Sequence, residues 1–206
     1  MNTDQDNLKN AFRLVNQIFI EVALLIQDFE SVFIDKGDDF ISLHNGHEIG
    51  TESSNSLNVG GKWLKKYVMR YFLPKSKKES FEHLLGIGVA YNFDHQKDAS
   101  PKLILGIIEN DFNEGNHEKY YYWWIPFLYD SKEMHKFEPE ITSVSDLESR
   151  TWYSLDPSPS AKLNLPLFGK GYLYFTDLLD VQSFDDVKKL ADELREKYKS
   201  LYSNET

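Results

Sequence analysis

Three apolar runs follow one another in the middle of the chain: HLLGIGVAYNF (residues 83–93), KLILGIIE (residues 102–109) and KYYYWWIPFLY (residues 119–129). Their length and their content of β-branched and aromatic residues predict strands. The linkers between them are short and polar, whereas a parallel pair needs a crossover of a dozen or more residues. The region therefore predicts a three-stranded antiparallel meander over residues 83–129, around which the rest of an α+β fold is built.

Neither of the first two runs has a polar face, which predicts a sheet covered on both sides. Gly86, Gly88 and Gly106 would together leave a shallow trough on such a sheet. Either a small ligand approaches the backbone there, or large side chains fill the space, since strand glycines often mark close packing.

Two amphipathic helices are predicted to pack on the sheet, which we expect to have about five strands. The first covers residues 7–34, where apolar residues recur with a heptad spacing. The second covers residues 183–202 and begins with a capping-box-like Ser183 and Asp186. Further short strands are predicted at residues 151–155 and 171–176. A coiled-coil dimer through the first helix is the alternative to an intramolecular core, although its e positions are apolar rather than charged.

Length and composition favour one globular domain over residues 1–206. The chain has no cysteine, which excludes disulfides and thiolate metal sites and is typical of cytoplasmic proteins. The formal net charge of −10 disfavours general binding to nucleic acids or anionic membranes. No apolar run approaches the roughly 20 residues of a membrane span. We expect a soluble cytoplasmic monomer or homodimer, and the sequence assigns no cofactor.

Asn45-Gly46 is the strongest turn signal and predicts a two-residue hairpin within residues 40–49. His44 and His47 would face each other across this turn. Two imidazoles at that spacing could share a metal, but no third ligand is fixed by the pattern, so exposed hairpin residues are the simpler interpretation.

Residues 62–73 are predicted to form a second helix that ends at Pro74. Four basic residues would share one of its faces: Lys62, Lys65, Lys66 and Arg70. This face is either an ordinary solvated helix face or a local binding site for phosphates, such as those of a nucleic acid.

Four acids are the candidates for catalysis: Glu21, Asp94, Glu109 and Asp111. Glu21 interrupts the most apolar part of the first helix, and the others lie at predicted strand ends. Over residues 7–111, the order helix acid, strand, Asp, strand, Glu loosely resembles the restriction-endonuclease-like nuclease core. That resemblance implies a helix Glu, a strand Asp and a Glu-x-Lys gathered around a divalent metal. The pattern departs from it at Asp111, which stands where the lysine should be, and at Asp94, which ends its strand.

The leading hypothesis from these features is a non-enzymatic binding or interaction domain of unassigned role, and the sequence leaves open whether its partner is a protein or a local nucleic-acid contact. The first alternative is a nucleic-acid-directed protein, either a metal-dependent nuclease or a degenerate relative of one. The second alternative is a small-ligand binder that uses the glycine trough.

Overall fold

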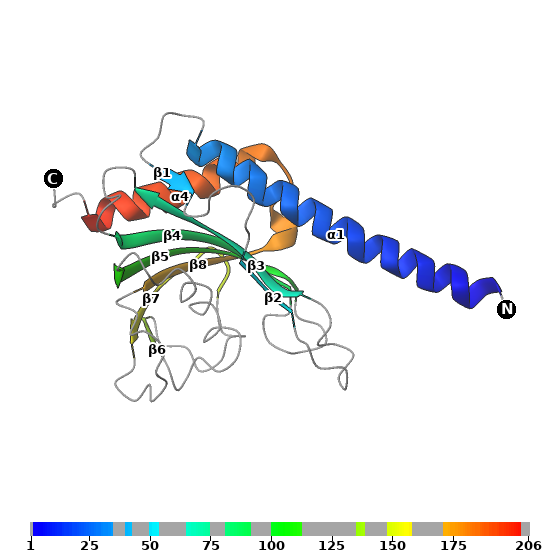
Figure 1. The fold of residues 1–206 in the computed structure, drawn as a ribbon. Helices are drawn as coiled ribbons and strands as arrows, with labels where there is room; N and C mark the ends of the chain where they lie inside the picture. Colours follow the sequence, from blue (N-terminus) through cyan, green and yellow to red (C-terminus); the bar gives the residue numbers. More distant parts are fainter. Residues whose placement is uncertain are drawn as a thin grey trace.

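One antiparallel sheet organises the protein and carries two helices on one of its faces (Figure 1). The computed structural model describes residues 2–34, 40–42, 50–53, 65–74, 81–91, 100–112, 135–138, 148–157 and 171–202. The helices are α1 (Asn2–Ile34), the 3₁₀ helix η5 (Leu178–Asp180) and α4 (Phe184–Tyr202). The strands are β1 (Phe40–Ser42), β2 (Gly50–Ser53), β3 (Lys65–Pro74), β4 (Phe81–Ala90), β5 (Lys102–Phe112), β6 (His135–Glu138), β7 (Trp152–Pro157) and β8 (Gly171–Asp177). The predicted α+β class is confirmed.

The strand order in the described sheet is β1-β3-β4-β5-β8-β7-β6, and β2 also pairs with β3. Five of these strands have six residues or more, as expected, and three short strands of three or four residues extend the sheet at its edges. The strands predicted at residues 151–155 and 171–176 correspond to β7 and β8.

The meander prediction is confirmed for its first two strands. β4 and β5 pair antiparallel, with Leu85 opposite Ile107. Along the other edge of β5, the residues from Lys102 to Ile108 pair with β8. The predicted third strand, residues 119–129, lies outside the described part of the chain. The prediction from short linkers considered only strands that are neighbours in sequence, whereas β8, which pairs with this edge of β5, comes from far along the chain.

The predicted helix over residues 62–73 is wrong, because Lys65–Pro74 form strand β3 at the centre of the described β1–β3–β4 region. The basic residues have helical spacing, but the segment Tyr-Val-Met-Arg-Tyr-Phe at residues 67–72 is rich in aromatic residues, which suit a pleated, half-buried surface. Pairing with strands on both sides decides the conformation.

The predicted hairpin within residues 40–49 does not join paired strands. Both β1 and β2 are antiparallel to β3 and lie on its same edge, because β4 occupies the other edge. They therefore run in the same direction, whereas hairpin strands run in opposite directions. The predicted turn itself, with His44 and His47, lies outside the described residues.

The core lies between the helices and one face of the sheet. Val68, Ile87 and Leu105 of the central strands pack there against Ile26 and Phe29 of α1. Alternate residues such as Leu84, Ile104 and Leu173 belong to the opposite face and are also buried. The prediction that the sheet is covered on both sides is confirmed for these described positions.

Polar contacts fasten the C-terminal half of α1 to the sheet and to α4. Arg70 of β3 forms an ion pair with Glu30, with 2.6 Å between Nη2 and Oε1. Arg195 of α4 donates a hydrogen bond to the main-chain oxygen of Val32 at 2.6 Å and lies 4.8 Å from the ring centre of Phe33. This half of α1 is thereby held by both β3 and α4.

Candidate interaction surface

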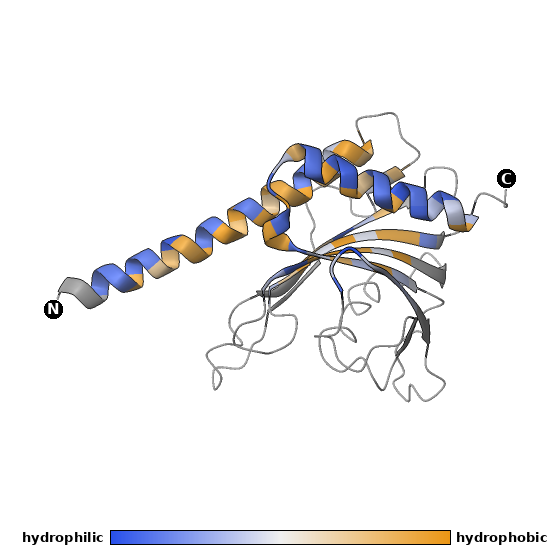
Figure 2. Cartoon of the chain, turned by 180° about the vertical axis from the view of Figure 1, so that it is seen from behind, coloured by the Kyte–Doolittle hydropathy of each residue, from blue (hydrophilic) through white to orange (hydrophobic). Residues whose placement is uncertain are grey.

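The N-terminal half of α1 extends beyond the sheet, as Figures 1 and 2 show. We call residues 2–20 the protruding half. Phe19 packs edge-on against Tyr91 at the end of β4, with ring centres 5.4 Å apart, where α1 leaves the sheet. Burial raises the pKa of Tyr91 to about 12, which is consistent with an apolar junction at this point.

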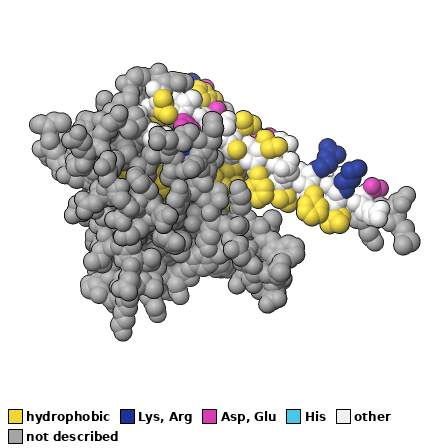
Figure 3. Space-filling view, in the orientation of Figure 1, with side chains coloured by type: hydrophobic (Ala, Val, Ile, Leu, Met, Phe, Trp, Pro, Cys, Tyr) yellow, Lys and Arg dark blue, Asp and Glu magenta, His cyan; other side chains and the backbone are white. Residues whose placement is uncertain are grey.

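Large apolar side chains remain exposed along the protruding half. Leu8, Phe12 and Leu14 are 60%, 68% and 63% exposed, and Ile18 and Ile20 are also exposed. Figure 3 shows hydrophobic side chains in a row along the projecting helix. The heptad positions of Leu8, Phe12 and Ile18 are buried further along α1, at Phe29, Phe33 and Val32, whereas that of Leu14 is taken by Glu21 and Asp28. The helix thus has one continuous apolar stripe, of which only the C-terminal part is covered.

A groove opens beside the base of the protruding half, between α1 and the segment from η5 to the first turns of α4. We call it the α1–α4 groove, and its volume is about 700 Å³. Its apolar lining is formed chiefly by Ile18, Val22, Leu24, Leu25, Pro101, Leu178, Leu179, Val181, Phe184 and Val187. Of these, Leu24, Leu179 and Phe184 are exposed, so the apolar surface of the groove continues that of the protruding half.

The charged side chains that line the groove are acidic. Glu21 accepts a hydrogen bond from the Gln17 side chain at 2.5 Å, and Asp28 lies two turns further along α1. Glu21 is exposed at the rim, as expected for an acid that interrupts an apolar helix without a buried partner.

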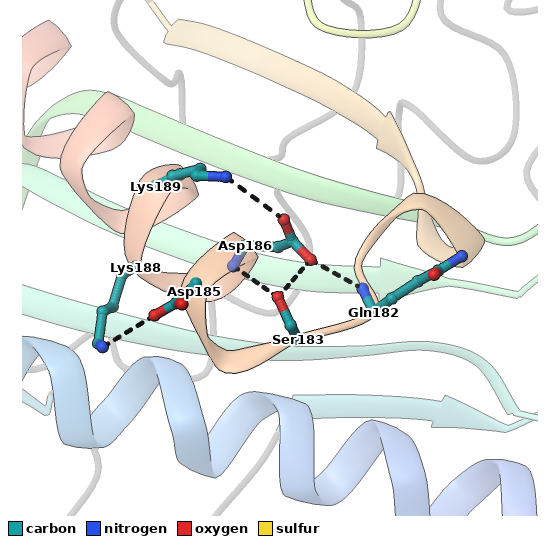
Figure 4. A network of polar contacts seen from close by, with 6 residues as sticks. All are labelled: Gln182, Ser183, Asp185, Asp186, Lys188 and Lys189. Atoms are coloured by element: carbon teal, nitrogen blue, oxygen red, sulfur yellow. Dashed lines mark hydrogen bonds and ion pairs between the residues drawn. The ribbon is translucent and has the colours of Figure 1, made fainter.

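The opposite wall of the groove is held by the cap of α4 (Figure 4). Ser183 Oγ donates to Asp186 Oδ2 at 2.6 Å and accepts from the Asp186 main-chain N–H at 3.2 Å. The Gln182 main-chain N–H also donates to Asp186 Oδ2 at 3.2 Å. The Ser183 bond, followed by the Gln182 bond, lowers the pKa of the Asp186 carboxyl. The capping box predicted from Ser183 and Asp186 is confirmed.

Asp177 fixes the entrance to η5 on the same wall. Burial raises the pKa of its carboxyl, but the hydrogen bonds from Ser100 and the Leu179 main chain, together with Lys102, outweigh that effect and hold the pKa below its usual range. The Leu179 bond is 3.1 Å long and caps the 3₁₀ helix. This geometry presents Leu179 at the edge of the groove.

Two of the candidate acids, Glu109 and Asp111, lie far from Glu21. Glu21 lines the groove together with Pro101, at the start of β5, whereas Glu109 and Asp111 lie near the other end of that strand. Eight residues of extended strand separate Pro101 from Glu109, which corresponds to about 26 Å. Asp94 lies outside the described residues. Within the described ranges, no group of three or more His, Asp or Glu side chains is placed to hold a metal.

Arg70, a member of the predicted phosphate site, is buried and paired with an acid. Arg70 is 2% exposed and forms its ion pair with Glu30 beneath α1, so it does not face solvent as the helix prediction required. A strand alternates its side chains between two faces, which places Arg70 with Val68 and Phe72 on the helix-covered face. Lys65 and Lys66 belong to β3, and Lys62 lies outside the described residues.

The three glycines of the predicted trough do share one face of the sheet. Gly86 pairs directly with Gly106, and Gly88 lies two residues further along β4. All three are buried, and a Cβ at Gly88 would lie only 3.2 Å from the main-chain oxygen of Val68. Close strand packing accounts for Gly88, and the α1–α4 groove lies on the other face.

Sequence reasoning missed the groove because it joins three segments that are far apart in the chain. The exposed stripe itself was visible as apolar residues over residues 8–20, but the pattern predicted core there.

Comparisons of the chain with protein-family models, curated proteins and solved structures found no match. Among the described helices, none combines the length and apolar character needed to cross a bilayer.

Proposed function

We propose that this protein is a non-enzymatic interaction domain and that the protruding half of α1 is the element that docks on a protein partner. The exposed row of Leu8, Phe12, Leu14 and Ile18 carries this proposal. Single exposed apolar residues are ordinary on protein surfaces, but contiguous apolar patches mark interaction sites.

The physical argument rests on what holds a helix together. Isolated helices of about 12–15 residues are marginal in water, and most helical stability in proteins comes from packing an apolar face. The C-terminal half of α1 has such packing from the sheet and α4. A docked partner would supply this packing for the protruding half. Each Å² of apolar surface that it buries would contribute about 25 cal/mol of stabilising free energy.

Two features separate this proposal from the alternatives. Arg70 is engaged by Glu30 and is therefore a poor phosphate ligand. The distance along β5 between the groove and Glu109 separates Glu21 from Glu109 and Asp111. A cytoplasmic location is part of the proposal and is supported by the lack of cysteine in the sequence.

Site-specific photo-crosslinking tests the proposal in cells that naturally produce the protein. A photoreactive amino acid at Phe12 should form a covalent adduct with a defined protein. The matched control has the same group at Asn16, which is also exposed on this helix. At 100° per residue, Asn16 lies about 40° beyond Phe12 and 160° from Leu14 around the helix. We expect one dominant adduct from position 12 that position 16 gives weakly. Equal, diffuse labelling from both positions would contradict a docking role.

A further inference from the structure

We propose that the α1–α4 groove of one copy receives the protruding half of α1 from a second copy, in an antiparallel two-fold dimer. This inference rests on the proposed function and names its partner. The groove and the helix that enters it are both present in each chain, so a two-fold axis near Ile18 would satisfy both at once.

The lengths of the two surfaces match. Along α1 the groove extends over the twelve residues from Gln17 to Asp28, which lie about 16 Å apart along the helix. The exposed apolar row covers the eleven residues from Leu8 to Ile18, which lie about 15 Å apart. Each copy can therefore fill the groove of the other without leaving a large part of either surface uncovered.

The residues that face the groove continue along the same face into the protruding half. Glu21 and Asp28 line the groove, and the same heptad position is Leu14 one step earlier. Ile18 and Leu25 also line it, with Ala11 one heptad before them. An antiparallel pairing centred on Ile18 places Ala11 opposite Leu25 and Leu14 opposite Val22, so that apolar residues meet.

The apolar face of the protruding half is wide enough to contact both walls of the groove. Leu14 and Ile18 would meet α1 of the second copy. Leu8 and Phe12 lie further round the helix and would meet its other wall, where Leu179 and Phe184 are exposed. A two-helix seam needs only a narrow a/d stripe, whereas a helix in a groove buries a broader one.

Charges at the edges are complementary. The groove lining contributes Glu21 and Asp28, while the exposed row from Leu8 to Ile18 includes Lys9 and Arg13 and no acid, and Asp4 and Asp6 precede it. Centred on Ile18, the antiparallel register places Arg13 opposite Ala23, two residues from Glu21, and Lys9 opposite Gln27, next to Asp28. A parallel pairing would instead bring Glu21 to Glu21, and like charges at an interface are repulsive.

The size also fits. The fifteen residues that line the groove, with the facing residues of the protruding half, approach the roughly 20–30 residues per partner of a standard interface. These surfaces would be covered in both copies by one symmetric contact.

Thiol crosslinking tests the pairing directly, because the chain has no cysteine and an introduced one is unique. Ile18→Cys should give a covalent dimer under mild oxidation or with a short bis-maleimide, since it lies next to the two-fold axis. Asn16→Cys is the matched control on the same helix and should give no covalent dimer. Leu8→Cys should not link to itself, because about 30 Å of helix would separate the two copies, but it should link to Phe184→Cys, on the wall that it faces, in a mixture of the two variants.

The mass of the unmodified protein provides an independent measurement. Light scattering should give twice 24.1 kDa at tens of micromolar protein, and Leu14→Asp should give a folded monomer. Arg13→Glu and Glu21→Arg should each weaken the dimer by about tenfold, and combining them should restore most of the affinity.

The outcomes separate this inference from the proposed function. Self-linking of Leu8→Cys would indicate a parallel pair and overturn the inference. A monomer at high concentration, with no more linkage from Ile18→Cys than from Asn16→Cys, would also overturn it. If the Phe12 photo-adduct were then another protein, the interaction domain would stand without the dimer, and if no specific adduct formed, both would fail.

Discussion

The two halves of α1 have the same apolar spacing and opposite surroundings. Phe29 and Phe33, in the C-terminal half, have no exposed surface, and Arg70 and Arg195 approach this half from β3 and α4. Phe12, in the protruding half, is 68% exposed. The difference lies in what is beside the helix, because the sheet and α4 cover only one half of its length (Figure 2).

This contrast shows that a heptad pattern identifies the face of a helix that will be buried but not the molecule that buries it. The C-terminal half is used to build the fold. The protruding half offers the same kind of surface to something else, which we infer to be a second copy. The predictions below test this division, from the largest expected effect on stability to the smallest.

Phe29→Ala should destabilise the protein by roughly 3–5 kcal/mol, because it removes a fully buried ring between α1 and the sheet. Urea unfolding, monitored by circular dichroism at micromolar concentration, measures this change. A loss below about 1 kcal/mol would mean that the C-terminal half is not core, and the contrast between the halves would collapse.

Glu30→Gln should cost about 2 kcal/mol, since it deprives the buried Arg70 guanidinium of its carboxylate. The expected loss is below that of a fully buried pair because Glu30 keeps some contact with water. The same unfolding measurement applies, with Arg70→Met combined with Glu30→Leu as the companion variant. If the double variant were less stable than Glu30→Gln, the cost would come from packing rather than from the lost charge partner.

Ser183→Ala should destabilise by about 1 kcal/mol through loss of the α4 cap, which supports the groove wall at Phe184 and Val187. The pKa of Asp186 is lowered in the folded protein. Its contribution to stability is therefore complete above its unfolded pKa of about 3.9, and it is lost as the pH falls through the lower folded value.

Unfolding measured from pH 7 down to pH 2.5 checks this sign. The difference between wild type and Ser183→Ala should shrink below about pH 4, and Asp186→Asn should flatten the same acid limb. A difference that grew on acidification would show that the cap does not depend on the carboxylate.

Phe12→Ala should change the stability of the dilute monomer by less than about 0.5 kcal/mol, because the ring is mostly exposed. The result should be compared with Phe29→Ala, which makes the same chemical change on the same helix. At concentrations where the dimer forms, Phe12→Ala should lower the apparent stability by weakening association. A large loss at every concentration would place the protruding half within the monomer core.

The sequence was sufficient to predict the elements whose apolar periodicity is long and regular. α1, α4 and the β4–β5 pair are examples, because many residues repeat one signal in each. It was insufficient for β3, where Lys65, Lys66 and Arg70 follow a helical spacing by chance while tertiary pairing imposes a strand. Which strand lies beside β5 was equally inaccessible, since β8 comes from far along the chain.

The candidate site could be predicted only in part. The spacing of Ser183 and Asp186 predicted the cap of α4. The sequence left Glu21 either at a solvated rim or buried, and the structure places it at the rim. The groove could not be predicted, because Leu25, Pro101 and Phe184 meet only after folding. The same limit applies to Leu8 and Phe12, whose exposure depends on where the sheet ends rather than on their own pattern.

The contact between α1 and α4 has a consequence during protein synthesis. Arg195 bonds to the main chain of Val32 across 163 residues, so ribosomes that add about 5–20 residues per second need roughly ten to thirty seconds to make the second partner after the first. During that interval the side of Phe33 that Arg195 covers in the folded protein stays exposed, as Phe12 does in the finished protein. In the nascent chain, both halves of α1 therefore expose apolar side chains. These side chains are then accessible to chaperones and to neighbouring chains on the same messenger RNA.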